Sequence, residues 1–409
     1  MPPDTATVAR LLRRTGFGPA PGEVESHASL ADARATVLAG AVDDGAEMPD
    51  PRDEDLDPAI TWWLRRMRRT TAPLHDKLVL FWHSNLTSSG DKASADMMVR
   101  QHNLIRRHAL GSFRDLLGAV VTDAAMLVFL DADGSSAEAP NENLARELME
   151  LFALGRGAYT EADVRAGAVA LAGFRVDWDS EAVGFDEDVA ATGPVTVLGH
   201  TEPMGAARLL DIVCEQPTCA EFVTAKLFRY LVGSDPSAAR LDALATTFRD
   251  SGLDIAALVE AIVGGDEITE GDGRVRWPIE WYIAAHQALG LDVDPEGIWL
   301  LYDLGQMPLY PPNVAGWPLG TQWANAGRQV LKASSMLDAF GKAAFVDFGG
   351  GSATERATAA LARCGVYDPS ATTVAALAAA VGTFDAGGIG DGDRMLLALA
   401  LTSPEASCA

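Results

Sequence analysis

Residues 141–155, Asn-Glu-Asn-Leu-Ala-Arg-Glu-Leu-Met-Glu-Leu-Phe-Ala-Leu-Gly, carry the clearest structural signal of the chain. Their apolar side chains recur at i, i+4, i+7 and i+8, the spacing of a helix that is buried along one side. Asn141 is a favourable N-cap residue, and Gly155 can adopt the left-handed conformation that closes a helix. The segment therefore predicts an amphipathic helix with well-marked ends.

The other face of this predicted helix is wholly polar. Two rows of side chains stack along it: Asn143, Glu147 and Glu150 form one row, and Glu142, Arg146 and Glu150 form the other. One interpretation is a solvent-exposed face held by Glu142–Arg146 and Arg146–Glu150 ion pairs. The other is a site in which short amides orient a carboxylate toward a ligand or metal. Because Asn is a weak helix former, the Asn-Glu-Asn start favours the second interpretation.

Helical patterns continue along most of the chain, and Thr160 with Asp163 resembles a capping box. Only residues 174–203 break this rhythm, because 174–178 alternate apolar and polar residues and 195–198 are rich in β-branched side chains. We therefore predict a mostly α fold, a multi-helix bundle with a small β-hairpin or extended insertion near 174–203.

Three parts of one integrated unit are predicted. Residues 1–58 form an N-terminal helical arm and acidic linker, residues 59–345 form a central helical domain that carries the Asn-Glu-Asn helix, and residues 346–409 form a C-terminal helical tail. No fixed repeat period of the solenoid type occurs.

The net charge of −25 and a pI near 4.5 argue against general affinity for nucleic acid or for an anionic membrane. The sequence contains no run of about 18 apolar residues, so it predicts no transmembrane helix. Its first residues also lack the apolar core of a signal peptide. We expect a cytoplasmic protein that does not contact membranes or nucleic acid. The four cysteines are too few and too irregular for a disulfide framework.

Several stretches together resemble a bacterial family known as domain of unknown function 1800. In the family's order, they are residues 11–18 (Leu-Leu-Arg-Arg-Thr-Gly-Phe-Gly), 80–83 (Leu-Phe-Trp-His), 108–114, 141–147 (Asn-Glu-Asn-Leu-Ala-Arg-Glu), 154–160, 311–317 and 403–405. The resemblance implies one family unit and no established activity. Family members are often encoded beside a sulfatase-like family, which implies a partner protein of that kind.

The chain departs from the family pattern at two places. The family usually has His-Asn-His after Phe-Trp, whereas this chain has His83, Ser84 and Asn85. The family usually has His-Asp before Gly-Pro-Lys-Thr, whereas residues 190–196 read Ala-Ala-Thr-Gly-Pro-Val-Thr. If those positions form the family's active centre, the chain has either a diverged specificity or a lost activity.

The sharpest chemical hypothesis joins His83 to the carboxylates of the 141–150 helix. Glu147, Glu142 and His83 are the predicted catalytic residues, with Glu147 as general base and His83 as acid. Glu147, Glu150 and His83 are the predicted ligands of a divalent metal, which would activate water for hydrolysis. The alternative is that His83 caps its own helix or satisfies a buried hydrogen bond.

Polar and aromatic residues complete the predicted cleft. The expected substrate-binding residues are Asn141, Asn143, Arg146, Asn85, Asn313 and Trp317, with Arg146 as an anion clamp. The 310–318 segment, with three prolines and a glycine, predicts a rigid aromatic loop. The leading hypothesis is an enzyme that hydrolyses or modifies a polar, glycan-like substrate. The alternatives are a catalytically degenerate binding or assembly partner and a purely structural helical protein.

Overall fold

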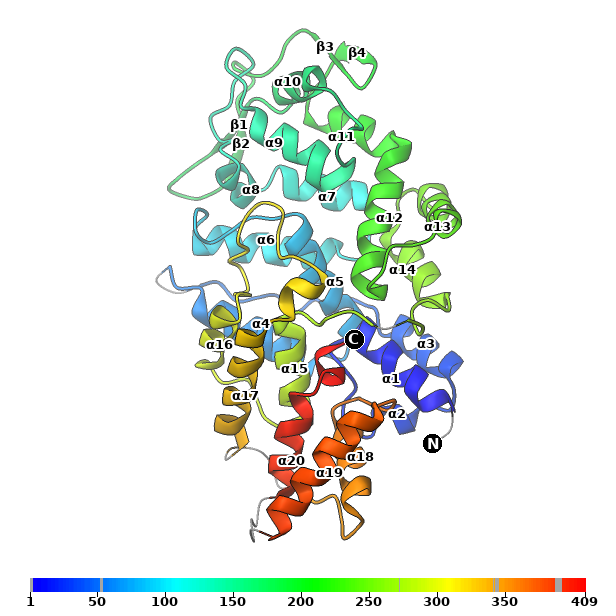
Figure 1. Ribbon diagram of the computed structural model, residues 1–409. Coiled ribbons are helices and arrows are strands. Elements are labelled where there is room, and N and C mark those ends of the chain that lie inside the picture. Colours follow the sequence, from blue (N-terminus) through cyan, green and yellow to red (C-terminus); the bar gives the residue numbers. More distant parts are fainter. Residues whose placement is uncertain (1–2, 52–53, 272, 341, 343–345, 387–391) are drawn as a thin grey trace.

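The computed structural model describes residues 3–51, 54–271, 273–340, 342, 346–386 and 392–409. Helices form most of it, and their order along the chain is visible in Figure 1. The α-helices are α1 (Pro3–Thr15), α2 (Glu23–Ser26), α3 (Leu30–Ala39), α4 (Asp57–Arg69), α5 (Pro73–Asn85), α6 (Ala95–His108), α7 (Phe113–Val121), α8 (Ala124–Phe129), α9 (Glu142–Glu147), α10 (Glu161–Ala170), α11 (Ala206–Glu215), α12 (Pro217–Val232), α13 (Ala238–Asp250), α14 (Ile255–Gly264), α15 (Pro278–Leu289), α16 (Gly297–Asp303), α17 (Ala326–Phe340), α18 (Ala353–Arg363), α19 (Ala371–Ala386) and α20 (Gly392–Leu401). The π-helix η1 (Leu148–Ala153) continues α9, and η2 (Gly320–Trp323) and η3 (Glu405–Ser407) are 3₁₀ turns.

Two small hairpins make up the strands of the described residues. β1 (Phe174–Val176) pairs with β2 (Val183–Phe185), and β3 (Pro194–Val197) pairs with β4 (His200–Pro203), both antiparallel. They lie toward one end of the molecule, where β1 contacts α8 and β3 contacts α10 (Figure 1). The predicted mostly α fold with an insertion near 174–203 is therefore confirmed.

Local sequence signals set several helix ends. The Ser94 side chain accepts a hydrogen bond from the Met97 amide and begins α6, and Thr160 with Asp163 forms the predicted capping box of α10. Such caps satisfy amides that the first turn of a helix leaves without partners.

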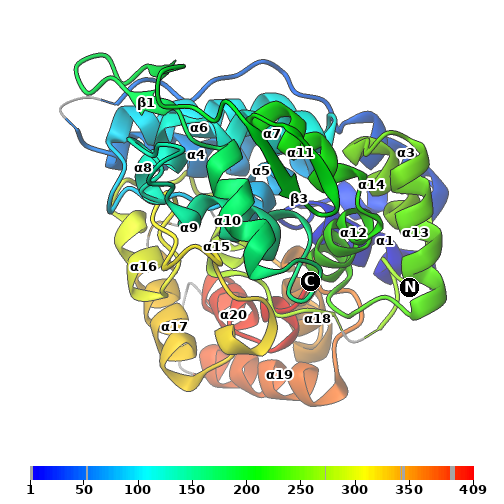
Figure 2. The ribbon, with the colours of Figure 1, turned by 90° about the horizontal axis from the view of Figure 1, so that it is seen from above.

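Helix α5 runs through the middle of the molecule and contacts α1, α3, α4 and α6 (Figures 1 and 2). Every residue from Leu74 to Ser84 is buried. Its three consecutive polar residues are therefore paired, as burial of charge requires. Asp76 accepts from Arg66 (3.2 Å) and Arg106 (2.5 Å), and the His75 ring lies 3.0 Å from the Arg106 carbonyl oxygen.

Lys77, the third of these residues, belongs to a buried ion network. Its ammonium lies 3.1 Å from the Glu280 carboxylate and also bonds to the carbonyls of Arg13 and Gly16, which end α1. Glu280 further accepts from the Arg274 guanidinium and from the Tyr230 hydroxyl (3.2 Å). The pKa of Glu280 falls to about 2, because these cations outweigh the effect of burial, which by itself raises it.

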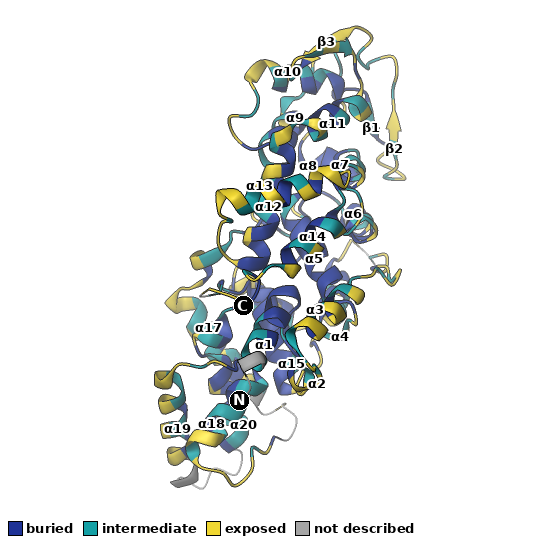
Figure 3. Cartoon of the chain, turned by 90° about the vertical axis from the view of Figure 1, so that its right-hand side faces the viewer, coloured by how far each residue is buried: buried dark blue, intermediate teal, exposed yellow. Residues whose placement is uncertain are grey.

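Contacts cross both predicted domain boundaries. Helix α1 packs on α5 and α12, and α15 packs on α20. Val275 also pairs with Cys408 in an antiparallel bridge. The division at 58/59 stays a prediction, and residue 345 of the second boundary lies outside the described residues. Buried residues run along the length of the molecule, as Figure 3 shows, and no described helix is long and apolar enough to span a membrane.

Candidate functional site

The polar face of α9 is a network of exposed ion pairs. Arg146 lies 3.0 Å from Glu142 and 2.7 Å from Glu161, and Glu150 lies 2.6 Å from Arg156. The predicted Glu142–Arg146 pair is present, but Glu150 pairs with Arg156 in place of Arg146. It also accepts from the Tyr159 hydroxyl at 2.9 Å. Most charges of this face are therefore neutralised by neighbours and are not directed at a ligand.

Glu147 is the exception on this face. It is partly buried and has no hydrogen bond or ion pair among the described residues. Burial, followed by repulsion from Glu150, raises the pKa of its carboxyl group above the usual value. A carboxyl group with a raised pKa is suited to proton transfer. The catalytic roles predicted for Glu142 and Glu147 stay predictions.

The predicted regular helix 141–154 changes type after Glu147. Asn141 caps it as predicted, with its side chain accepting from the Asn143 amide, and the Asn143 side chain is exposed. Leu148–Ala153 is then a π-helix, in which Leu154 donates to the carbonyl of Met149, five residues earlier. Gly155 (φ 81°) closes it, and a β-carbon there would lie 2.8 Å from the Phe222 ring. Single π-helical turns are frequent at functional sites.

The π-helix is joined to α12 by a lysine. The Lys226 ammonium donates to the Leu151 carbonyl at 2.8 Å, across 75 residues of sequence. A carbonyl group within the π-helix thus accepts its hydrogen bond from a side chain of another helix.

His83 does not meet the carboxylates of α9. It is buried between Trp63 (ring centroids 5.3 Å apart) and Trp317 (5.6 Å), and neither ring nitrogen has a hydrogen-bond partner in the described structure. Burial lowers the pKa of His83 to about 4, so the ring is neutral at pH 7. Among the described residues, no group of three His, Cys, Asp or Glu is placed to hold a metal. The metal site predicted from His83, Glu147 and Glu150 is therefore corrected, because the apolar environment of His83 separates it from both carboxylates.

The proline-rich loop is fixed directly against the end of α5. The Ser84 hydroxyl accepts from the Trp317 amide at 3.1 Å. A β-carbon at Gly316 (φ 75°) would lie 1.8 Å from the Ser84 carbonyl oxygen, so only glycine allows this approach. Asn313, predicted to bind substrate, accepts from the Ala315 amide at 2.9 Å within the loop. The indoles of Trp277 and Trp323 both donate to the Pro318 carbonyl, at 2.9 and 2.6 Å.

This fixed loop, α5 and α12 enclose a cavity of about 360 Å³, which we call the lysine cavity. It is lined by Phe81, Ser84, Asn85, Lys226, Arg229, Tyr230, Trp277, Ala315, Trp317, Pro318 and Leu319. Asn85 and Trp317, two of the predicted substrate-binding residues, both line this cavity, and their binding role stays a prediction. No residue of 141–150 lines it, and His83 lies behind Trp317.

Lys226 gives the cavity its chemistry. Desolvation, followed by repulsion from Arg229, lowers the pKa of its ammonium to about 8. No carboxylate of the described residues pairs with it, whereas Arg229 is bound to Asp235 at 2.5 Å. Sequence reasoning missed Lys226, because a single lysine in an amphipathic helix resembles a surface residue. Its position among apolar residues of α12 was the only available signal.

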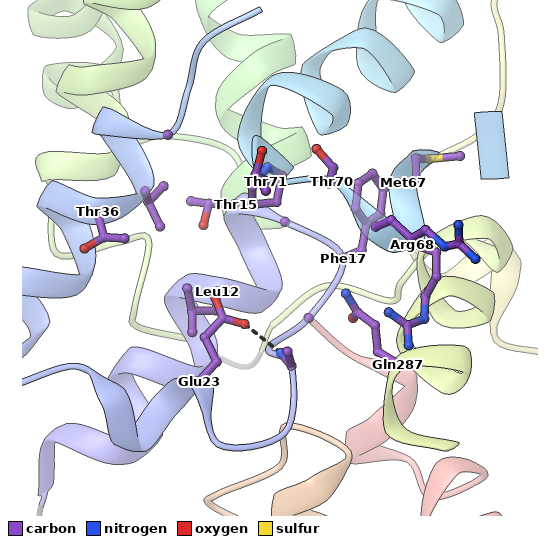
Figure 4. A pocket seen from close by; sticks show the side chains of 17 residues that line it. Leu12, Thr15, Phe17, Glu23, Thr36, Met67, Arg68, Thr70, Thr71 and Gln287 are labelled. Carbon is purple, nitrogen blue, oxygen red and sulfur yellow. Dashed lines mark hydrogen bonds between the residues drawn. The ribbon is translucent and has the colours of Figure 1, made fainter. Parts of the chain in front are cut away.

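A second cavity, of about 330 Å³, lies where the Thr15–Gly18 turn meets the end of α4 (Figure 4). Figure 4 shows Arg68 and Gln287 on one side of it and Glu23 on another. Several of its polar side chains already bond to backbone: Thr15 to the Leu11 carbonyl, Glu23 to the Ala20 amide and the Arg68 Nε to the Leu291 carbonyl. These bonds hold the walls of the cavity in place.

Comparison with known proteins gives one finding. A family model described as "Protein of unknown function (DUF1800)" matches residues 10–408, nearly the whole chain. No curated protein and no solved structure matches the chain.

Proposed function

The chain belongs to the DUF1800 family of proteins of unknown function, and we propose that it binds a small hydroxycarboxylic acid, such as a sugar acid, in the lysine cavity. In this proposal Lys226 binds the carboxylate and exchanges a proton with the ligand. The proposal keeps the predicted polar, glycan-like substrate and moves its main contact from the α9 carboxylates to α12.

The observation that carries the proposal is the state of the Lys226 ammonium. The Lys226 side chain lines the cavity, and its ammonium donates to the Leu151 carbonyl and lies 5.1 Å from the centroid of the Phe222 ring. It has no carboxylate partner among the described residues. A partly buried cation without a counter-ion favours binding of an anion, because the two charges offset each other's desolvation.

Asn85 supports a ligand that also carries hydroxyl groups. Its amide nitrogen donates to the Phe81 carbonyl at 2.8 Å, and its amide oxygen accepts no hydrogen bond among the described residues and is available as an acceptor. A hydroxyl group of the ligand can donate to this oxygen while the carboxylate meets Lys226. The floor of the cavity consists of buried aromatic rings, which exclude water and strengthen both contacts.

A proton-transfer role for Lys226 follows from its lowered pKa. A lysine with a pKa of about 8 is partly neutral near physiological pH and can accept a proton, whereas an ordinary lysine cannot. Binding and proton transfer are separable, because an arginine at this position keeps the charge and cannot be deprotonated.

The test is calorimetric titration of the full chain with glucuronate and galacturonate, with glucose and galactose as neutral controls. We expect Lys226→Met to weaken binding of the acids by at least about 10-fold, since a charged hydrogen bond contributes roughly 1.5–3 kcal/mol. Lys226→Arg should retain binding and lose any turnover that NMR detects for the wild type. Lys342→Met removes an exposed lysine and serves as the control. Equal affinity for acids and neutral sugars would overturn the proposal.

The predicted enzyme with Glu147 as general base is a second candidate, favoured by the raised pKa and missing partner of that carboxyl group. Turnover that is lost in Glu147→Gln and unchanged in Lys226→Arg would support hydrolysis on α9. A cytoplasmic location and a sulfatase-like partner protein stay predictions.

A further inference from the structure

A third cavity, of about 410 Å³, is lined by the first half of the loop, by α16 and by the start of α4. Trp299 and Tyr302 of α16 line it with 58% and 63% of their surface exposed, which is unusual for large aromatic residues. Tyr310 of the loop and two carboxylates, Asp57 and Asp91, complete the set. We call it the aromatic cavity.

The charges around the aromatic cavity have one sign. Burial, followed by the charges of Asp57, Asp91 and Asp55, raises the pKa of the Tyr310 hydroxyl. None of the three carboxylates forms an ion pair within the described residues, and Asp57 accepts no hydrogen bond there.

The neighbouring cations are engaged elsewhere. Lys92, next to Asp91 in sequence, bonds to Asp131 and to the Phe129 carbonyl. Arg328, behind Gly305, donates to the carbonyls of Leu304 (2.7 Å) and Gln322 (2.8 Å) and stacks on Trp323. Neither residue lines the cavity. Its negative charge is therefore open to a cation from outside.

The Tyr310 part of the aromatic wall is held in position before any ligand arrives. The Tyr310 ring packs on Gly90, where a β-carbon would lie 2.9 Å from the ring, and the Gly90 amide donates to the Leu309 carbonyl at 2.9 Å. Trp299 and Tyr302 meet edge to face, with ring centroids 6.3 Å apart. A fixed wall loses little conformational entropy on binding.

We propose that the aromatic cavity binds an organic cation, an alkylated ammonium group that sits against Trp299, Tyr302 and Tyr310 with Asp57 and Asp91 as counter-charges. Aromatic faces attract such cations through the ring quadrupole, and the carboxylates add long-range attraction. A neutral ligand would use the rings and gain nothing from the carboxylates. This ligand differs in charge from that of the lysine cavity, and the two proposals stand independently.

The test is titration of the full chain with choline and with 3,3-dimethylbutan-1-ol, its neutral isostere, followed by NMR of the tryptophan indole signals. We expect saturable binding of choline and at least about 10-fold weaker binding of the isostere, as the size of cation–π and carboxylate contacts implies. Trp299→Ala should weaken choline binding by about 10-fold or more, and Trp299→Phe should restore part of it. Asp57→Asn should weaken it by a few fold.

Trp178→Ala is the matched control, because Trp178 is similarly exposed (65%) and lies in the turn between β1 and β2, outside the aromatic cavity. Its choline affinity should equal that of the wild type. Equal binding of choline and its isostere would instead indicate an apolar or sugar-stacking site and overturn the proposal. The proposal would also be overturned if the folded wild-type protein showed no saturable binding of choline. Equal losses of choline affinity in Trp178→Ala and Trp299→Ala would overturn it as well.

Discussion

The lysine cavity and the aromatic cavity are lined by opposite halves of one loop, yet they have opposite charge. Ala315, Trp317, Pro318 and Leu319 line the first, and Tyr310 and Pro312 line the second. The loop itself contributes no charged side chain, so the neighbouring helices set the sign: α12 supplies Lys226, and the start of α4 supplies Asp57. A chain with a net charge of −25 can therefore hold a local cationic site. The net charge describes the field around the whole protein and does not give the charge of a single cavity.

The two cavities also differ in how they use aromatic residues. Trp277 and Trp317 are 1% and 4% exposed and form a floor, whereas Trp299 and Tyr302 expose most of their rings. A floor of this kind changes the pKa of a neighbouring lysine, and an exposed ring contacts the ligand itself. The same residue type thus has two roles, which follow from burial alone.

Removing the buried charge of Glu280, which accepts from Tyr230 of the lysine cavity, should have the largest effect on the free energy of unfolding. Glu280→Gln leaves Lys77 and Arg274 buried without a counter-charge, and we expect a loss of about 3–5 kcal/mol in the free energy of unfolding. In the wild type, the ionised Glu280 carboxylate contributes to folding stability above pH 4.5. This contribution is lost as the pH falls toward 2, because the pKa of Glu280 in the folded state is lowered to about 2. Urea unfolding at pH 7 measures the loss. A variant as stable as the wild type would contradict the network.

Displacing the shared loop should disturb both cavities at once. Gly316→Ala places a β-carbon against the Ser84 carbonyl, and we expect a loss of about 3 kcal/mol together with weaker binding at both sites. Gly320→Ala is the control, because Gly320 has a similar φ (80°) and open space around it, and it should cost about 1 kcal/mol. Equal losses in the two variants would mean that the contact with Ser84 is unimportant.

The pH dependence of stability should separate the two cavities. The folded pKa of Lys226 is about 8 and its unfolded value is about 10.5, so the folded state carries a penalty while the lysine is charged. Unfolding takes up a proton between pH 8 and 10.5, and this group therefore raises stability as pH increases through that window. We expect Lys226→Met to be more stable than the wild type by about 1–3 kcal/mol at pH 7 and to lose this advantage near pH 10.5.

Guanidinium unfolding of both proteins across this range, with Lys342→Met as control, measures the difference. A constant difference at every pH would contradict the assignment. Asp57→Asn, on the acidic side, should show no change in this window, because carboxylates titrate well below it.

The smallest effect is expected on the paired face of α9. Glu147→Gln removes a charge that has no partner and is repelled by Glu150, so stability at pH 7 should change by less than about 0.5 kcal/mol or rise slightly. Glu142→Gln should lose a similarly small amount, because its pair with Arg146 is exposed. Thermal unfolding of the two variants checks this. A loss of stability above about 2 kcal/mol in either variant would show that this face contributes more to folding than exposed ion pairs do.

Sequence patterns predicted the features that depend on near neighbours. The Asn141 cap, the Gly155 end, the Thr160 capping box and the 174–203 excursion all follow from residues a few positions apart. Asn85 and Trp317 line one cavity, and the substrate-binding role expected for them stays a prediction. The burial of His83 depends on Trp63 of α4 and on Trp317 of the loop. The bond from Lys226 to the π-helix spans 75 residues and the Ser84–Trp317 bond spans 233, and periodicity holds no information about such contacts.

The π-helix changes the direction in which the side chains of α9 point around the helix axis, compared with a regular α-helix. Each residue of an α-helix turns the chain by about 100°, and a π-helical turn absorbs one residue more. Deleting one residue within 148–153 would restore a regular helix and rotate everything before it, including the Glu142–Arg146 face, by about 100° relative to Gly155 and Phe222. The extra residue thus acts as a spacer that lets one end of the helix stay locked on α12 while Arg146, at the other end, pairs with Glu161 of α10.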